Sequence, residues 1–390
     1  MNRRTFVLGA SGAMLAQAAP SDQLNVGIIG SGGRGRFLMQ RFATDPAVRL
    51  TAVCDVYEPN LEAGLSLAKG QGKAHRHYKE LLNDKSIDIV VIATPEHWHA
   101  QMVLDALAAG KDVYVEKPLC HTPEQGVELM QAARHSKQIV QVGMQRRSYP
   151  LYLKARDIRA AGTLGNVRLV RTWWINNSLK RGPDEKLTGP LDWEQWQGPA
   201  PHHPMELDRF RNWRNYKDYA GGIVADQGAH IYDSIHLIRG VGFPAAVNAS
   251  SGKVHSSEGD TPETVVVVAE YPEDFLGVFT INYAGMHYPS RLDQLNQFDG
   301  DEARMDVGRE FLSVYKQAEP ETPAITDNGN FGTATDAHIQ NFLECVRTRK
   351  QPNATIEKGF QAALVIQMAN LSLGTGRWIR WNSQMLKVEV

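Results

Sequence analysis

A strand-like run, a glycine-rich turn and an acidic residue twenty positions later constrain this chain more than any other feature. The apolar run Leu24–Ile29 is predicted to be a buried strand that leads through the turn into a helix. Such a turn lets backbone N–H groups approach a pyrophosphate. Asp55 ends a second strand-like run, Val48–Cys54, where a carboxylate accepts the ribose hydroxyls of a dinucleotide. The turn residues are Gly30, Gly32, Gly33, Arg34 and Gly35.

Asp55 also distinguishes between the two nicotinamide dinucleotides. A carboxylate at this position repels the 2′-phosphate of NADP, so the sequence predicts NAD as the cofactor. Arg34 within the turn keeps NADP open as the less favoured alternative, because a guanidinium attracts phosphate.

The composition excludes several other classes of protein. With 390 residues, of which 42% are hydrophobic, the chain is long enough to bury two cores. Its net charge of -1 argues against nucleic acid or an anionic membrane as a main partner. Cys54, Cys120 and Cys345 form no C-x-x-C pair, so we expect neither a disulfide framework nor a zinc site.

Residues 1–20 are predicted to be a twin-arginine export signal. Arg3 and Arg4 precede a short apolar stretch that ends near Ala16-Gln17-Ala18, a small-residue cleavage site. The stretch is too short to span a bilayer and no cysteine follows it, so no stable membrane anchor is expected. The alternative is a ragged amphipathic N-terminus. Export of the folded protein to the periplasm or beyond favours a cofactor that is bound in the cytoplasm, held tightly and recycled.

Residues 24–148 alternate between strand-like and helix-like patterns. This alternation is typical of a doubly wound parallel sheet with helices on both faces. Further strands are predicted at 87–93, 113–115 and 139–142, and helices near 59–69, 99–109 and 122–136.

Residues 149–390 follow a different pattern and form the second predicted domain. Closely spaced strand patterns without intervening helices indicate a mainly antiparallel sheet. After a helix at 150–161, strands are predicted at 167–175, 245–254, 263–271, 276–284 and 291–298, with Pro-rich and Trp-rich loops at 182–216. Two closing helices, 333–349 and 356–373, are expected to pack back on the first domain within the range 333–373.

Three polar clusters accompany the glycine turn. Thr94-Pro95-Glu96-His97-Trp98-His99 follows one predicted strand, and Glu116-Lys117-Pro118 follows the next. Ligands of open α/β sheets bind at the carboxyl ends of the strands, where both clusters lie. Asp226 and His230 are four residues apart and therefore share one face of a helix.

Together these motifs resemble the glucose–fructose oxidoreductase, inositol dehydrogenase and MocA family. The likeness rests on the Gly30–Gly35 turn, Thr94-Pro95, Glu116-Lys117-Pro118 and Asp226-x-x-x-His230, in that order, and covers essentially the whole chain after the signal. It implies an N-terminal Rossmann domain and a C-terminal α/β domain. The open, mainly antiparallel sheet of the second domain would mediate homo-oligomers.

The resemblance also implies the roles of the catalytic set. Lys117 would lie beside the substrate and the nicotinamide, His230 would be the acid/base group, and Asp226 would orient and tune the site. The chemistry agrees, because hydride leaves a carbinol carbon only as the hydroxyl proton is taken, and imidazole titrates in the useful range. A nearby ammonium stabilises the developing alkoxide.

The remaining candidate residues complete a cofactor set and a substrate set. Lys117 belongs to the cofactor set as well as to the catalytic set. The tryptophans of the loops at 182–216 either stack on sugar rings or pack within the protein. No metal is predicted: His97 and His99 lack a third ligand, and Lys117 opposes a cation near Asp233 and His236. The cofactor set adds Thr94, Pro95, His99, Glu116 and Gln145 to the turn and Asp55; the substrate set is His97, Trp98, Arg146, Tyr149, Trp174 and Arg214.

The sequence thus predicts an exported NAD-dependent oxidoreductase that acts on a carbohydrate hydroxyl. The alternative is a glycosidase with the same site, because the export signal and the loop Glu96–His99 also resemble the NAD-dependent N-acetylgalactosaminidase branch. There, transient oxidation acidifies a neighbouring C–H, and elimination, water addition and re-reduction follow. A third alternative is a non-catalytic NAD-bound sugar sensor.

Overall fold

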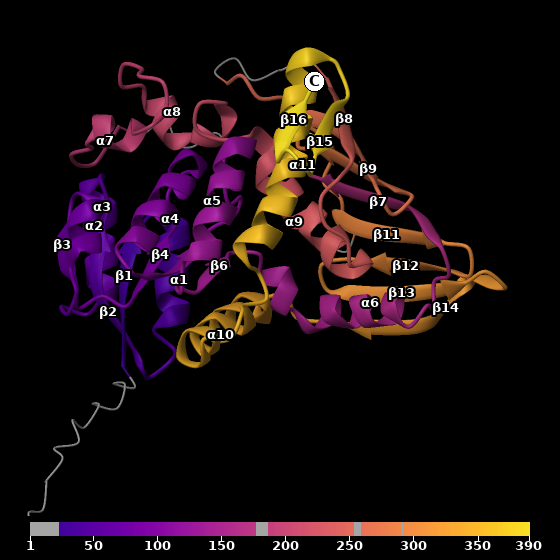
Figure 1. The fold of residues 1–390 in the computed structure, drawn as a ribbon, viewed down its shortest axis with the longest axis horizontal. Helices are drawn as coiled ribbons and strands as arrows, with labels where there is room; N and C mark the ends of the chain where they lie inside the picture. The colour runs from indigo at the N-terminus through magenta and orange to yellow at the C-terminus, as the bar shows by residue number, and fades with distance from the viewer. Residues whose placement is uncertain (1–22, 177–185, 253–258, 290–291) are drawn as a thin grey trace, which may run out of the picture.

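The computed structural model describes residues 23–176, 186–252, 259–289 and 292–390, and Figure 1 shows two domains side by side. The export signal predicted at 1–20 lies outside the described residues. No described helix is long and apolar enough to cross a membrane.

The first domain is a six-stranded parallel sheet in the order β3-β2-β1-β4-β5-β6. Helices cover both faces, so β4, β5 and β6 are buried throughout. This confirms the predicted doubly wound sheet. The strands are β1 (Leu24–Ile29), β2 (Val48–Cys54), β3 (Lys73–His75), β4 (Ile89–Ile92), β5 (Asp112–Val115) and β6 (Val140–Val142). The helices are α1 (Gly33–Phe42), α2 (Glu58–Leu67), α3 (Tyr78–Asn83), α4 (His99–Ala108) and α5 (Pro123–His135).

The second domain carries a ten-stranded sheet in the order β14-β13-β12-β11-β7-β10-β9-β8-β15-β16. Its paired strands run antiparallel except for β7 beside β10, which are parallel. The mainly antiparallel sheet is therefore confirmed. The strands are β7 (Val167–Ile175), β8 (Ala246–Ser251), β9 (Thr264–Tyr271), β10 (Phe275–Asn282), β11 (Gln294–Gly300), β12 (Ala303–Val307), β13 (Phe311–Lys316), β14 (Glu319–Asn328), β15 (Ile379–Asn382) and β16 (Lys387–Glu389).

Three helices of the second domain pack against one face of this sheet: α6 (Pro150–Ala160), α9 (Gly222–Arg239) and α11 (Ile356–Thr375). Residues alternate between buried and exposed along β9 and β10, as expected for a sheet with one covered face. The side chains of α9 are buried along most of its length, and the start of α9 meets the first domain, where the Gly221 N–H donates to Glu96. This matters because α9 carries Asp226 and His230.

Two other elements join the domains. The helix α10 (Thr333–Thr348) contacts α1 and the 3₁₀ helix η2 (Gln145–Ser148) of the first domain, and Phe342 packs edge-on against Tyr114 of β5. Residues 186–219, which we call the capping segment, lie above α2, α3 and α4 in Figure 1. This segment contains α7 (Trp193–Gln197), α8 (Leu207–Arg211) and η3 (Trp213–Asn215).

Candidate active site

A cavity of about 570 Å³ opens where the carboxyl ends of the first sheet meet α9 and the capping segment. Its size lies within the usual range of ligand pockets, roughly 300–1,000 Å³. The glycine turn and Asp55 line one end, and Lys117, Asp226 and His230 line the other. The crevice sits beside β1 and β4, where the strand order reverses and where open α/β sheets bind ligands.

The glycine turn fits the close approach that a pyrophosphate requires. Gly30 has a φ of +86°, a conformation that L side chains rarely adopt. A Cβ at Gly35 would lie 2.0 Å from the backbone oxygen of Gly30, so only glycine allows this turn. The helix α1 begins at Gly33, directly behind the turn, and directs its N-terminal N–H groups toward an anion.

Asp55 is oriented by its backbone neighbours at the same end of the cavity. Its Oδ2 accepts a hydrogen bond from the Ser31 N–H at 2.8 Å, and its Oδ1 accepts from the Tyr57 N–H at 2.9 Å. Burial raises the pKa of Asp55 although these hydrogen bonds oppose the shift. The carboxylate therefore lies where it can accept ribose hydroxyls, as the sequence predicts.

Arg34 forms an ion pair with Glu116 across the floor of the cavity. The Nε and NH2 nitrogens of Arg34 each lie 2.7 Å from Oε1 of Glu116, which follows β5. This pairing neutralises the guanidinium that kept NADP open as an alternative. Burial lowers the pKa of Arg34, but the nearby carboxylate of Glu116 outweighs this effect and raises it.

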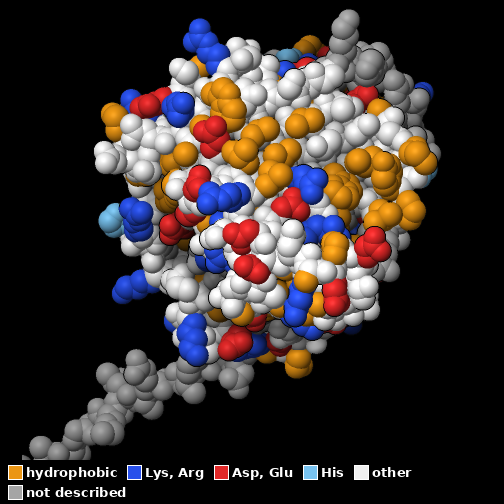
Figure 2. All heavy atoms as spheres, turned by 90° about the vertical axis from the view of Figure 1, so that its right-hand side faces the viewer, with side chains coloured by type: hydrophobic (Ala, Val, Ile, Leu, Met, Phe, Trp, Pro, Cys, Tyr) orange, Lys and Arg blue, Asp and Glu red, His pale blue; other side chains and the backbone are white. Residues whose placement is uncertain are grey.

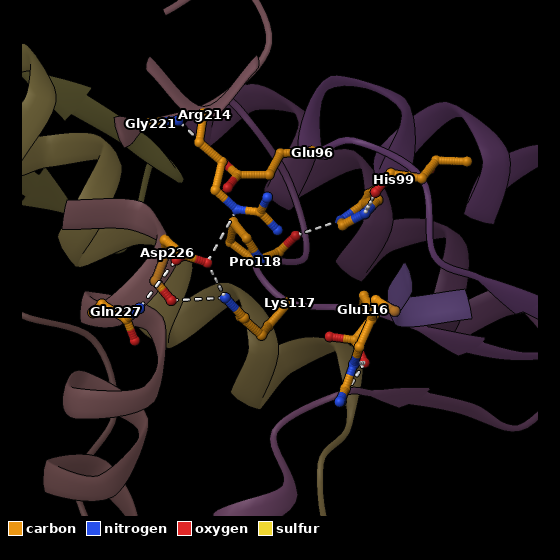
Figure 3. Close-up of polar contacts among 11 residues, drawn as sticks. Glu96, His99, Glu116, Lys117, Pro118, Arg214, Gly221, Asp226 and Gln227 are labelled. Atoms are coloured by element: carbon orange, nitrogen blue, oxygen red, sulfur yellow. Dashed lines mark hydrogen bonds and ion pairs between the residues drawn. The ribbon is translucent and has the colours of Figure 1, made fainter. Parts of the chain in front are cut away.

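Lys117 and Asp226 meet at the opposite end of the cavity (Figure 3). The Lys117 Nζ donates to Oδ1 of Asp226 at 2.7 Å and to the backbone oxygen of Asp226 at 2.7 Å. Burial raises the pKa of Asp226, but the cations Lys117 and Arg214 outweigh burial and hold the pKa well below its ordinary value. The carboxylate is therefore ionised and fixes the ammonium in place.

His230 lies one turn further along α9 and lines the same cavity. Burial lowers its pKa well below the ordinary value of 6.5, and the charges of Lys117 and Arg146 lower it further. The imidazole is consequently neutral at neutral pH and can accept a proton. Asp226 opposes this shift but does not reverse it.

Glu96 is a functional candidate that the sequence prediction left out of its site. Its side chain lines the cavity, and its Oε2 accepts the Gly221 N–H at 3.1 Å, next to the start of α9. Burial raises the pKa of Glu96 to about 7. The position of Glu96 directly after the predicted strand 87–93 was the one sequence signal for a role in the site. Only the fold shows that α9 begins beside its carboxyl group.

Other predicted cofactor residues also line the cavity, namely Thr94, Pro95, His99 and Gln145, while Gly35 lies behind the turn. His99 links two loops, because its Nδ1 lies 2.7 Å from the Pro118 oxygen and its Nε2 lies 2.9 Å from the Thr94 oxygen. Burial lowers the pKa of His99. Its position thus supports a role in shaping the loops that border the cavity.

The structure separates the predicted substrate contacts into two groups. Trp98 and Arg214 line the cavity. The other four lie outside its lining: His97, Arg146, Tyr149 and Trp174. The His97 Nε2 lies 3.1 Å from the Trp196 oxygen in a buried aromatic cluster, so packing explains this histidine. Tyr149 is buried against Phe331, with ring centroids 5.6 Å apart.

Arg146 and Trp174 lie one layer behind the site. The Arg146 guanidinium is fully buried, donates to Ser234 and Gln294, and lies 5.6 Å from the Trp174 ring. The Trp174 ring in turn lies 6.4 Å from His230. Both residues therefore lie outside the cavity lining, and the Trp174 ring links Arg146 to His230. Among the described residues, no group of three or more His, Cys, Asp or Glu side chains is placed to hold a metal ion.

Both halves of the chain match one protein family. Residues 24–144 match the oxidoreductase family's NAD-binding Rossmann domain, and residues 192–380 match that family's C-terminal α/β domain. The chain belongs to the Gfo/Idh/MocA oxidoreductase family. It is accordingly an NAD-dependent enzyme of this family, and its first domain is the NAD-binding domain.

Relatives with similar sequences differ in their chemistry. The uncharacterized oxidoreductase YrbE of Bacillus subtilis is 22% identical over 91% of this chain and 95% of its own length. Inositol 2-dehydrogenase of Salmonella typhimurium is 32% identical, over 40% of this chain and 47% of its own. A glycosyl hydrolase family 109 protein of Shewanella is 33% identical, over 32% of this chain and 29% of its own length. The family therefore includes sugar dehydrogenases and glycosidase relatives.

Solved structures share the whole fold. Levoglucosan dehydrogenase in complex with NADH has a TM-score of 0.74 at 18% identity and covers 92% of this chain and 99% of its own. An oxidoreductase domain protein from Kribbella flavida also has a TM-score of 0.74, at 21% identity, and covers 91% and 98%. At these identities the likeness establishes the two-domain fold.

Proposed function

We propose that this enzyme oxidises a hydroxyl of a sugar or glycoside and passes the hydride to a tightly held NAD. One observation carries the proposal: Lys117, fixed by Asp226, and the neutral His230 line the end of the cavity opposite the glycine turn. A cation and a base at one point are what the removal of a hydroxyl proton requires.

Each residue of this set has a separate task in the proposed reaction. His230 takes the hydroxyl proton, because burial keeps its imidazole neutral. The Lys117 ammonium stabilises the developing alkoxide, and the ionised Asp226 holds that ammonium at 2.7 Å. Bound NAD supplies the hydride acceptor. Gly30 and Asp55 at the other end fit its pyrophosphate and ribose.

A redox-neutral glycosidase is the second candidate. It is favoured by the relatives in glycosyl hydrolase family 109 and by Glu96, a carboxyl in the cavity lining whose pKa burial raises to about 7. A group with this pKa can both donate and accept protons near neutral pH. Transient oxidation of one sugar carbon, loss of the neighbouring C–H proton with the aglycone, water addition and re-reduction would leave no net redox change.

Product analysis separates these functions. The purified, folded protein is incubated with a panel of glycosides and free sugars without added cofactor, and the products are measured by mass spectrometry. A mass loss of two hydrogens supports oxidation, and a released unoxidised sugar supports the glycosidase. Lys117→Met is the control, and conversion should depend on Lys117. No change with any sugar would contradict both functions and favour a sugar sensor.

Export is part of the proposal. Arg3-Arg4 and the small-residue cleavage site support transport of the folded, NAD-loaded protein to the periplasm or beyond. Replacement of both residues, Arg3→Lys with Arg4→Lys, should leave the protein in the cytoplasm with its mature activity intact. Cell fractionation measures this, and an unchanged periplasmic yield would contradict twin-arginine transport.

Homo-oligomerisation through the outer sheet face is also part of the proposal. Figure 2 shows hydrophobic side chains between charged ones on the side of the molecule away from the first domain. On the strands, Val266 is 39% exposed and Leu276 is 40% exposed, and Leu276 pairs with Leu169. Replacement of Leu276 and Val266 by glutamate should lower the mass seen in analytical ultracentrifugation. A wild-type monomer would contradict this interface.

A further inference from the structure

The capping segment comes from the second domain but attaches to the cofactor domain beside Asp55. The Glu58 N–H donates to the Pro190 oxygen at 3.0 Å, and the Asp192 N–H donates to the Val56 oxygen at 2.9 Å. These bonds flank a short antiparallel bridge between Tyr57 and Leu191. The connection between β2 and α2, which follows Asp55, is therefore tied to the capping segment along its backbone.

Side chains hold the capping segment at two further points. The Tyr57 hydroxyl lies 2.9 Å from Oγ1 of Thr188 and accepts the Thr188 N–H at 3.0 Å. In the loop after β4, the Trp98 indole N–H donates to the Trp196 oxygen at 2.9 Å. The capping segment is thus attached to the loops that follow two different strands of the first sheet, β2 and β4.

The capping segment also has a hydrophobic core of its own. Trp193 and Trp196 stack with ring centroids 4.8 Å apart, and Tyr219 packs edge-on against Trp196 at 4.7 Å. All three rings are buried together with Tyr216. Aromatic pairs of this kind contribute beyond the area they bury, so the segment is a packed unit and not a loose loop.

Side chains of this unit form a wall of the cofactor cavity. Phe210 and Arg211 line the cavity together with Asp55 and Tyr57, and the Phe210 ring lies 5.3 Å from the Tyr57 ring. The buried Nε of Arg211 has no hydrogen-bond partner among the described residues. A buried donor without a partner is costly, and a ligand oxygen would satisfy it.

We propose that the capping segment completes the adenosine end of the NAD site and keeps the cofactor bound while the hydride taken from one hydroxyl is returned to a carbonyl, either of the same sugar or of a second carbonyl substrate. Tyr57 and Phe210 form the apolar wall, and Arg211 donates to a ribose or phosphate oxygen opposite Asp55. NAD then leaves only when the bonds of Pro190, Asp192 and Thr188 to the first domain open. Retention of NAD during catalysis rests on the proposed function. Binding of NAD does not, because residues 24–144 match the NAD-binding domain of the family.

The test measures exchange of the cofactor and not activity. The natively purified protein is desalted, its NAD(H) is released with acid and counted per chain, and a parallel sample is incubated with isotopically labelled NAD. Mass spectrometry then follows the appearance of label in the bound pool. Wild-type protein should keep its cofactor through desalting, and Phe210→Ala with Arg211→Ala should exchange at least about tenfold faster, the scale of one lost hydrogen bond and packed ring.

Two further variants keep the outcome clear. Tyr57→Phe removes the hydroxyl that bonds Thr188 and also interacts with Arg211, and should accelerate exchange to a smaller extent, even if the double variant fails to fold. Trp378→Ala removes an aromatic ring that is 41% exposed and outside the cavity lining, and should not alter exchange. A folded double or Tyr57→Phe variant with wild-type exchange would overturn the proposal.

The test also separates this proposal from the proposed function. A wild-type protein that loses NAD on desalting but oxidises a sugar when NAD is added would overturn the proposal that the capping segment retains NAD, and would support the proposed function. A protein that retains NAD but converts no sugar would contradict the proposed function and would still support retention of NAD by the capping segment.

Discussion

The two ends of the cavity are built in different ways. At the nucleotide end, Asp55 and Ser31 hydrogen-bond across 24 residues of one strand–helix–strand unit, and the glycine turn lines the cavity beside them. At the substrate end, Lys117 and Asp226 meet across 109 residues and two domains. The glycine turn and Asp55 thus depend on local chain geometry, whereas the pairing of Lys117 with Asp226 depends on how α9 docks.

The electrostatics of the two ends differ in the same way. Asp55 accepts hydrogen bonds from the N–H groups of Ser31 and Tyr57 and from the Ser31 hydroxyl, and none of the described cations hydrogen-bonds to it. At the other end, Lys117, Asp226 and Arg214 compensate one another in a partly buried cluster. Removal of one partner there leaves another charge without compensation. Substitutions of the less exposed members of this cluster should therefore cost more than substitutions at the nucleotide end, and that difference can be measured.

The largest effect is expected for His230→Ala and Lys117→Met. Each should lower turnover by about 10²–10⁴-fold, because each removes a group needed for proton transfer from the hydroxyl. The double variant should lose little more than either single variant, since the residues act as a unit. Steady-state kinetics measure this, and the NAD content of His230→Ala is the control that should stay unchanged. Wild-type turnover in a folded His230→Ala protein would end the comparison.

Glu96 tests how strongly burial acts at the substrate end. Its folded pKa of about 7 exceeds its ordinary value of 4.5, so the folded state binds a proton that the unfolded state has lost between these pH values. Stability should therefore fall as the pH rises from 4.5 to 7, by on the order of 3 kcal/mol. Glu96→Gln should remove most of this dependence. Urea unfolding at pH 5 and pH 8, at matched NAD content, measures it, and identical pH profiles would refute the explanation.

Asp55→Ala probes the nucleotide end with a smaller expected cost. NAD binding should weaken by roughly 1–3 kcal/mol, the scale of lost hydrogen bonds to a charged group. Turnover at saturating NAD should remain close to that of the wild type, because Asp55 lies at the far end of the cavity from Lys117. Calorimetric titration of the NAD-free protein measures the affinity. If Asp55→Ala lowered turnover at saturating NAD but left NAD affinity unchanged, Asp55 would act in the reaction and not in NAD binding, contrary to this prediction.

Arg214→Gln should have the smallest effect. The Arg214 Nε lies 3.4 Å from Oδ1 of Asp226, but its side chain is 51% exposed, so solvent screens the interaction. Exposed ion pairs contribute up to about 1 kcal/mol, which limits the change in kcat/KM to several-fold. The change should also shrink at high salt. A loss as large as that of His230→Ala would show that Arg214 binds the substrate directly.

The contrast between locally determined geometry and contacts between distant residues also explains which elements the sequence predicts well. The Gly30–Gly35 turn, the strands Val48–Cys54 and Val167–Ile175, and the helix that carries Asp226 and His230 are set by local pattern, and all were predicted. The strands β12–β16 are not predicted. β14 contains two prolines and is mostly exposed, and β15 and β16 are short, so these three do not stand out. β12 alternates between buried and half-buried residues over only five positions, and the prediction missed it although the pattern was present.

The site beyond its motifs could not be predicted from local pattern. His97 and Tyr149 have side chains suited to a sugar site, but the fold buries them in aromatic clusters away from the cavity. Conversely, Phe210 and Arg211 reach the cavity only because the capping segment crosses to the other domain. Contacts between residues far apart in the chain decide both cases.

A buried ion pair fastens α9 to the first domain. The Arg147 Nε lies 2.5 Å from Oδ1 of Asp233, which follows His230 by three residues on the same helix. Arg147 follows β6 of the first domain, so the base and the cofactor domain share one rigid attachment. The loops around the cavity can therefore diverge to accept other sugars while the distance over which hydride must pass stays the same.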